Sequence, residues 1–318
     1  MMSTWTETPG WLRQPESLPY GDAAGVTVLD GTVIVFARAE LPMQVLDDDG
    51  AVSEAWGRDL FVSPHGITAS GGLLLCVDDK DHVVRALDAG GAEHWRLGEP
   101  GVASDTGFDG SVPPDQRSIT QAAGPFHRPT HATRDESGRV FVTDGYGNSR
   151  IHRFDAAGAH EHSWGAPGSR LGEFFVPHSV EHVADGRLLV CDRENDRIQL
   201  FDVDGAQLGA WLDVARPSDV AQLDDGLVAV AEMGWRAGES DFAGRVRTTA
   251  VAPSISVRQQ DGSVVHRITG SDVGPLRAPH GIAAAPDGTL YVAELLGSVL
   301  GRADASLSGE TLRRFTRV

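Results

Sequence analysis

The chain has 318 residues, 41% of them hydrophobic and 23% charged, and 27 basic against 45 acidic side chains give a formal net charge of −18. This balance argues against a nucleic acid or an anionic membrane as a partner, because phosphate groups are bound by basic surfaces. We expect no membrane-spanning helix, no secretory signal and, with only two cysteines, no disulfide framework, and therefore a cytoplasmic protein.

After an expected N-terminal extension over residues 1–19, a repeated unit begins. Each unit has a lead residue, a β-rich run, a turn and a second β-rich run. The second run ends 13 or 14 positions after the lead residue, as from His65 to Asp78 and from His178 to Asp192. The six lead residues are, in chain order, Gly25, His65, His131, His178, Asp219 and His280. Six units of short strands predict an all-β fold, a six-bladed β-propeller, as a single domain over residues 20–318.

Two of the units are lengthened by insertions. Residues 97–126 and 234–255 are rich in small, turn-forming and acidic residues. Loops of this length in a compact domain are usually functional or disordered. Residues 97–126 join the outer strand of one blade to the lead residue of the next. We therefore expect this insertion on the face of the molecule where the lead residues lie.

The lead residues contain an unusual number of histidines. In a propeller the first strand of each blade lines the central channel, so the lead residues are expected to form a ring. His65, His178 and His280 belong to alternate blades and are expected to form a triangle on the axis. Three imidazoles leave coordination positions open for water or substrate, as in catalytic zinc sites. The sequence therefore predicts a Zn²⁺ site with these three ligands, and His131 is expected to act nearby as a catalytic or substrate-contacting residue.

The residues that end the second runs are mostly acidic. An acid that recurs in every blade is expected to be structural, binding backbone N–H groups of a loop. The departures from the repeat are more informative: Arg38 replaces the acid in the first unit, and Tyr146 and Arg193 follow the acid in two others. Two arginines beside a metal suit a carboxylate substrate, and a tyrosine there can act as a general base.

Several segments resemble the peptidyl-α-hydroxyglycine α-amidating lyases, whose bacterial relatives contain NHL-type repeats. They are VFVTDGYGNSRI at 140–151, VPHSV at 176–180, CDRENDRIQLF at 191–201 and the two PHG motifs at 64–66 and 279–281. The resemblance implies that zinc is held by His65, His178 and His280. It also implies that Tyr146 is the base and that Arg193 and Arg38 are the active-site arginines.

This chain departs from the family pattern at three places. The family has an aspartate that binds a structural calcium where this chain has Gly281, so the resemblance leaves calcium open. A disulfide-forming cysteine of the family is replaced by Gly147, which agrees with a reducing compartment. His131 stands where the family usually has an aspartate, a change that would fit a different substrate.

These observations predict a zinc-dependent lyase. It would cleave the C–N bond of an α-hydroxy-N-acyl compound, a carbinolamide such as an α-hydroxyglycine derivative, to an amide and glyoxylate or a similar aldehyde. The substrate would be a small molecule or a peptide with a carboxylate. Two alternatives remain open: another metal-dependent propeller enzyme, such as a hydrolase or lactonase, and a non-enzymatic NHL-type binding propeller that holds no metal tightly.

Overall fold

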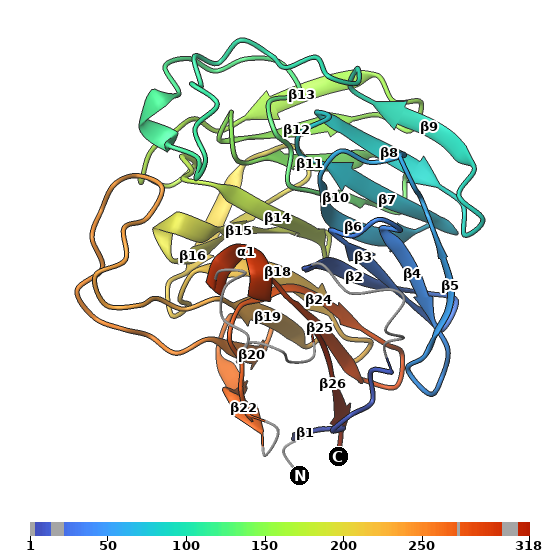
Figure 1. Ribbon diagram of the computed structural model, residues 1–318. Helices are drawn as coiled ribbons and strands as arrows, with labels where there is room; N and C mark the ends of the chain where they lie inside the picture. The colour runs from blue at the N-terminus through green and yellow to red at the C-terminus, as the bar shows by residue number, and fades with distance from the viewer. Residues whose placement is uncertain (1–3, 14–21, 272–273, 301–310) are drawn as a thin grey trace.

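A computed structural model describes residues 4–13, 22–271, 274–300 and 311–318. Its strands form six four-stranded antiparallel sheets that surround a central axis like blades (Figure 1). The chain is therefore a six-bladed β-propeller, and the predicted fold is confirmed.

The first three blades follow one another in the sequence. The first contains β2 (Ala23–Leu29), β3 (Thr32–Ala37), β4 (Met43–Leu46) and β5 (Val52–Trp56). The second contains β6 (Pro64–Ser70), β7 (Leu73–Asp78), β8 (Val83–Leu87) and β9 (Glu93–Leu97). The third contains β10 (His131–Arg134), β11 (Val140–Asp144), β12 (Arg150–Phe154) and β13 (His160–Trp164).

The remaining three blades complete the ring. The fourth contains β14 (Pro177–His182), β15 (Leu188–Asp192), β16 (Arg197–Phe201) and β17 (Gln207–Trp211). The fifth contains β18 (Pro217–Gln222), β19 (Val228–Glu232), β20 (Ser254–Arg258) and β21 (Val264–Ile268). The sixth contains β24 (Pro279–Ala284), β25 (Leu290–Glu294), β26 (Leu312–Arg317) and β1 (Trp5–Glu7). A small separate pair is formed by β22 (Gly270–Ser271) and β23 (Gly274–Pro275).

The position of a strand within its blade explains its composition. The second strands are covered on both faces by neighbouring blades, so β15 reads LLVCD and is buried along its whole length. The outermost strand β13 reads HEHSW and has three exposed residues in a row. Continuous apolar runs are expected for strands buried on both faces. The apolar side chains gather in six clusters among the described residues, each between two adjacent blades.

The N-terminal segment closes the ring. Trp5–Glu7 pairs antiparallel with β26, so the sixth blade takes its outer strand from the beginning of the chain and its third strand from the end. The buried Glu7 carboxylate binds the Arg313 guanidinium, and Trp5 Nε1 donates to Gly288 O at 2.9 Å. The expected extension over residues 1–19 therefore needs a correction: its described strand is part of the propeller.

Both insertions consist mainly of turns and irregular segments. The first contains the short 3-10 turn η1 (Gln116–Ser118), and a second such turn, η2 (Arg193–Asn195), follows β15. One short helix, α1 (Leu296–Leu300), follows β25 and lies near the centre of the view in Figure 1. No helix in the described part of the chain is long and apolar enough to cross a membrane.

Candidate metal centre

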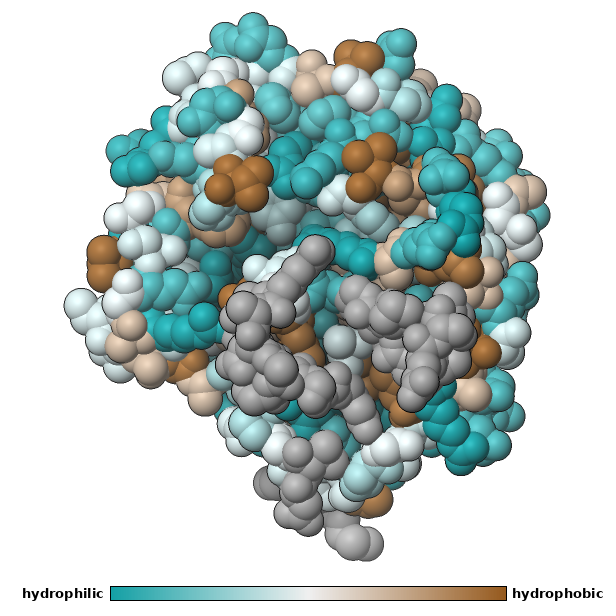
Figure 2. All heavy atoms as spheres, viewed as in Figure 1, coloured by the Kyte–Doolittle hydropathy of each residue, from teal (hydrophilic) through white to brown (hydrophobic). Residues whose placement is uncertain are grey.

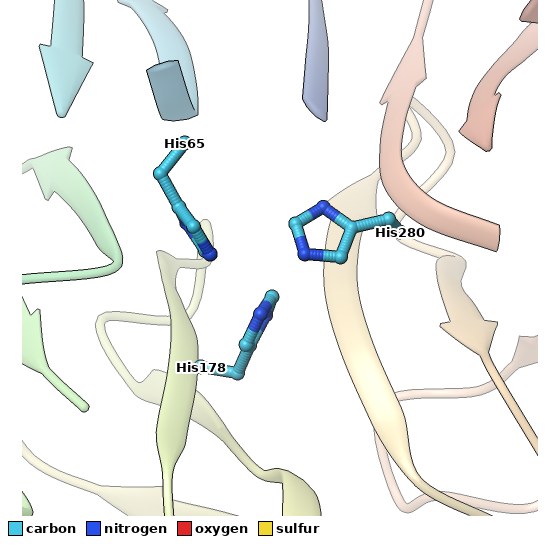
Figure 3. A group of neighbouring side chains, drawn as sticks. All are labelled: His65, His178 and His280. Carbon is cyan, nitrogen blue, oxygen red and sulfur yellow. The ribbon is translucent and has the colours of Figure 1, made fainter. Parts of the chain in front are cut away.

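Three histidines from alternate blades meet on the axis. His65, His178 and His280 lie on β6, β14 and β24 and point toward one another (Figure 3). Each is at most 2% exposed, and one potential ligand atom from each lies within 4.8 Å of the other two. The structure thus brings together the three residues for which a metal site was predicted.

The backbone fixes which nitrogen of each ring faces the axis. Nδ1 of each histidine lies 2.6 or 2.7 Å from a carbonyl oxygen of the neighbouring blade: Thr130 O, Ser218 O and Ala24 O. A carbonyl oxygen can only accept a hydrogen bond, so Nδ1 must hold the proton. Nε2 of each ring is then left with its lone pair, which is the state that binds a metal.

Electrostatics favours the same state. Burial lowers the pKa of all three histidines well below the usual value, and the positive charges of Arg38 and Arg193 lower it further for His65 and His280. For His178, Arg193 is the largest cause after burial. Neutral imidazoles at pH 7 are ready to ligate. Nε2 of His280 is also buried without a hydrogen-bond partner among the described residues, an acceptor that a metal ion would satisfy.

The ring predicted from the sequence is out of register by one residue in three blades. The carbonyl partners show that Ala24, Thr130 and Ser218 are the equivalents of the three histidines. The predicted ring members Gly25, His131 and Asp219 each stand one residue later, in a second layer of the channel. In two of these blades the equivalent residue, Ala24 or Ser218, lies at the same bulge as His178, between the first two paired positions of the blade's first strand.

Tyr146 lies directly beside the triangle. Its hydroxyl oxygen is 2.9 Å from Nε2 of His65, 3.3 Å from Nε2 of His178 and 3.4 Å from Nη1 of Arg193. The Arg128 guanidinium packs 5.0 Å from the centre of the tyrosine ring. The phenol oxygen therefore touches two of the candidate ligands and one candidate substrate-binding cation.

The two predicted arginines lie on opposite sides of the triangle. Arg193 belongs to η2, is 3% exposed and donates from Nε to Glu194 Oε1 at 2.7 Å. Its Nη2 is buried and has no partner among the described residues, so it can bind a further acceptor. Arg38 donates to Pro64 O and to Ser298 Oγ and forms no ion pair with any described residue.

A cleft of about 600 Å³ opens over this group. Tyr146, Arg38, Arg193 and His280 all line it, together with residues of both insertions, such as Pro113 and Phe242. Five of its lining side chains are cationic and two are acidic, which contrasts with the acidic chain as a whole. In Figure 2, many residues near the middle of this face, above the grey atoms, are hydrophilic, with hydrophobic residues scattered around them. The cleft is suited to an anionic ligand.

His131 lies in a different cavity. Its Nδ1 contacts Val180 O at 3.2 Å, its Nε2 contacts Thr68 Oγ1 at 3.1 Å, and Asp219 Oδ1 is 3.8 Å away. His131, Thr68 and Asp219 line a channel cavity of about 150 Å³ whose walls include none of Tyr146, Arg193 and Arg38. The structure therefore separates His131 from the other residues predicted to be catalytic. The same cavity holds Glu181, which the sequence analysis did not single out.

The repeated acids hold loops, as the sequence predicted. Asp78 accepts from Val62 N and Ser63 N, Asp144 from His127 N and Asp192 from Phe175 N. Glu232 and Glu294 bind backbone N–H groups in the same way. None of these five acids lines the cleft. At Gly281, where calcium was left open, an added Cβ would lie 2.9 Å from Gly25 Cα, so the channel has little room for a side chain there.

Sequence reasoning missed the residues that support Tyr146 and Arg193. Gln116 is fully buried in the first insertion, and its Nε2 donates to Tyr146 O at 2.6 Å. Glu194 is fully buried beneath Arg193 and also accepts from Arg216. Burial works against its charge, yet the guanidiniums of Arg193 and Arg216 hold the pKa of Glu194 below its usual value. Gln116 lies outside the repeat and left no signal, whereas Glu194 stands within the DREN motif.

No protein-family model matches the chain. The probable peptidyl-alpha-hydroxyglycine alpha-amidating lyase of Caenorhabditis elegans is 27% identical over 266 residues, which are 79% of this chain and 66% of that protein. The chain is thus similar to a protein with this name over most of its length. Peptidyl-glycine alpha-amidating monooxygenase A of Xenopus laevis is 31% identical to this chain over 258 residues, 76% of this chain and 24% of that protein.

Other similarities agree with the fold. Human NHL repeat-containing protein 3 is 30% identical to this chain over 217 residues, 64% of this chain and 58% of that protein. The chain thus spans at most about two thirds of the length of these relatives. A solved streptogramin B lyase structure superposes with a TM-score of 0.60 at 14% identity and covers 99% of this chain and 98% of its own. At that identity the likeness concerns the fold alone.

Proposed function

We propose that the protein is a zinc-dependent lyase that cleaves the C–N bond of an α-hydroxy-N-acyl compound. The products are an amide and glyoxylate or a similar aldehyde. The observation that supports this most directly is the position of the Tyr146 hydroxyl, 2.9 Å from His65 and 3.3 Å from His178, where a base would stand beside a metal-held substrate. The similarity to proteins named peptidyl-alpha-hydroxyglycine alpha-amidating lyase points to the same chemistry.

The three buried histidines suit zinc, which is held in catalytic sites by three protein ligands with a fourth position open. A zinc ion bound there would supply a Lewis acid for an oxygen of the substrate. The chain itself supplies the polar groups around it. Nη2 of Arg193 has an unmet hydrogen bond, and Arg38 has no acidic partner among the described residues, so both can bind the substrate carboxylate.

The proposed reaction needs no additional reactant. Tyr146, as the phenolate, accepts the proton of the substrate hydroxyl, and the electron pair of that O–H bond forms the C=O bond of the aldehyde. The C–N bond breaks, its electron pair goes to the amide nitrogen, and that nitrogen takes the proton from Tyr146, which becomes a phenolate again. Arg193, 3.4 Å from the phenol oxygen, stabilises negative charge on it during the transfer.

The test is a product assay with N-benzoyl-α-hydroxyglycine as the probe. Zinc-loaded protein is expected to release glyoxylate and benzamide in equal amounts, and a chelator should abolish the reaction. Tyr146→Phe is expected to lower kcat by about 10²–10⁴-fold, the usual contribution of a general base. Tyr291→Phe is the matched control, because Tyr291 is also largely buried but packs against Trp11 in the sixth blade.

Two results would contradict the proposal. A carboxylate product formed by addition of water would favour the hydrolase or lactonase alternative. Equal activity of the Tyr146→Phe and Tyr291→Phe variants would exclude Tyr146 as the base.

A further inference from the structure

The two insertions meet the two candidate catalytic residues in one closed circuit of hydrogen bonds. Gln116 Nε2 donates to Tyr146 O at 2.6 Å, and Gln116 N donates to Phe242 O at 2.9 Å. Phe242 N donates to Glu194 Oε2 at 3.1 Å, while Glu194 Oε1 accepts from Arg193 Nε at 2.7 Å. Arg193 Nη1 then reaches the Tyr146 hydroxyl at 3.4 Å and closes the circuit.

Gln116 is the member of this circuit that joins the insertions. It lies in the 97–126 insertion, and its backbone binds Phe242 of the 234–255 insertion. Its side chain is fully buried and satisfied at both ends, because Oε1 accepts from Ser149 Oγ at 2.5 Å. A buried amide with every polar atom bonded has one orientation, and it holds its partners in place.

Ring contacts follow the same path. The Arg193 guanidinium lies 4.9 Å from the centre of the Phe242 ring and 5.6 Å from that of Tyr146. The Phe242 and Tyr146 ring centres are 6.4 Å apart. A shift of the second insertion would therefore displace both the cation and the phenol that face the cleft.

We propose that Gln116 is a positioning residue that fixes Tyr146 directly and Arg193 through Phe242 and Glu194. Both insertions are then fixed walls of the active site. This inference rests on the proposed function for its kinetic readout only. Displacement of a reacting group by about 1 Å can lower a rate by about 10²-fold, so a residue that never touches substrate can have a large effect on kcat.

The test compares Gln116→Ala with Gln121→Ala. Gln121 is in the same insertion but exposed, and among the described residues its side chain donates only to Asp105 O of its own loop. Gln116→Ala is expected to lower kcat on N-benzoyl-α-hydroxyglycine by about 10- to 100-fold with KM within about threefold. Bound zinc should be unchanged, and Gln121→Ala should match wild type. The isosteric Gln116→Glu change replaces the Nε2 donor to Tyr146 O and should lower kcat by a similar factor. It takes the place of Gln116→Ala in the test if the alanine variant does not fold.

A double-mutant cycle separates positioning from general support of the structure. In a Tyr146→Phe background, Gln116→Ala should lower kcat by a smaller factor than in the wild-type background, because one of the two groups that Gln116 positions no longer acts as the base. The same loss in both backgrounds, or an unchanged kcat in the single variant, would overturn the inference.

Hydrogen exchange gives a readout that needs no substrate. The Phe242 amide, which donates to Glu194, should exchange at least about fivefold faster in Gln116→Ala than in wild type or Gln121→Ala. If wild type turns over no carbinolamide, the proposed function is wrong. The exchange rate of the Phe242 amide then tests by itself whether Gln116 holds the circuit in place. Unchanged exchange would then refute it.

Discussion

Replacing His178 by alanine should abolish tight metal binding. His178 is one of three buried imidazoles whose Nε2 atoms face the axis, and no other described His, Cys, Asp or Glu belongs to that group. The other two rings are held by Thr130 O and Ala24 O and stay in place when His178 is removed. The variant should thus keep the site's shape and lose one third of its ligands.

The size of the effect follows from the number of ligands. Structural zinc sites with four ligands bind with about 10–16 kcal/mol, or about 3–4 kcal/mol per ligand on an equal division. Loss of one imidazole should therefore weaken zinc binding by roughly 10²–10³-fold. A site that binds zinc in the nanomolar range would then release it during dialysis against a weak chelator.

Elemental analysis after such dialysis measures this directly. Wild type and a His162→Ala control should retain about one zinc per chain, because His162 is exposed on β13 in the third blade. The His178→Ala variant should retain little. Equal zinc in wild type and His178→Ala would refute the assignment of the triangle, and a wild type without zinc would refute the proposed mechanism.

Three further predictions concern stability, each measured by urea unfolding. Burial, followed by the carboxylate of Asp219, raises the pKa of Glu181 to about 8. Folded Glu181 thus stays protonated between its ordinary pKa and about 8 while the unfolded chain is ionised, so stability falls as pH rises through this window. Glu181→Gln should remove up to about 5 kcal/mol of that loss, and an equal pH dependence of the unfolding free energy in wild type and Glu181→Gln would contradict this. Gly66→Ala should lower the free energy of unfolding by about 1–3 kcal/mol, because the added Cβ would lie 2.5 Å from Thr130 O. In the control Gly209→Ala, the added Cβ meets nothing within 4 Å, so the free energy of unfolding should change by less than about 1 kcal/mol. Glu7→Ala should lower the free energy of unfolding by about 3–5 kcal/mol, because it removes the Glu7 carboxylate that binds the buried Arg313 guanidinium. A change below about 1 kcal/mol would show that the ring closes without this ion pair.

The repeat made the propeller and the histidine triangle predictable. Strands that recur at nearly constant spacing must occupy equivalent places in successive blades, so His65, His178 and His280 had to share one level of the channel. The same reasoning placed Tyr146 and Arg193 at the rim, since they stand two residues and one residue after a repeated acid. Local spacing sufficed here because all these positions are fixed by hairpins.

The register of His131 was predictable but was missed. A uniform spacing of 14 residues to the end of the second strand selects Ala24, Thr130 and Ser218, whereas the lead residues chosen for those blades gave 13. The spacing of 13 from His65 to Asp78 belongs to one blade, where Ser70 pairs with Leu73 and the turn between the first two strands is short, whereas in the fourth blade His182 pairs with Leu188. Uneven turns and bulges thus obscure a one-residue shift, and that shift decides which layer of the channel a side chain enters.

Long-range contacts could not be inferred from spacing. Nothing near Gln116 in the sequence points to Tyr146, because their contact depends on how an irregular insertion folds across a neighbouring blade. The role of Trp5–Glu7 was hidden for the same reason, since a three-residue strand has no pattern of its own and its partner lies at the far end of the chain.

The pairing of β1 with β26 has a consequence for synthesis on the ribosome. Domains begin to fold while their C-terminal part is still being made. Here the sixth blade cannot be completed until Leu312–Arg317 has left the exit tunnel, and Trp5–Glu7 has no strand to pair with before then. The first five blades can pack together earlier. The apolar faces of the first and fifth blades that contact the sixth blade remain exposed to solvent during that time. The nascent chain therefore depends on Leu312–Arg317 to cover two hydrophobic surfaces at once, and stalling of translation before this segment emerges would expose both to chaperones.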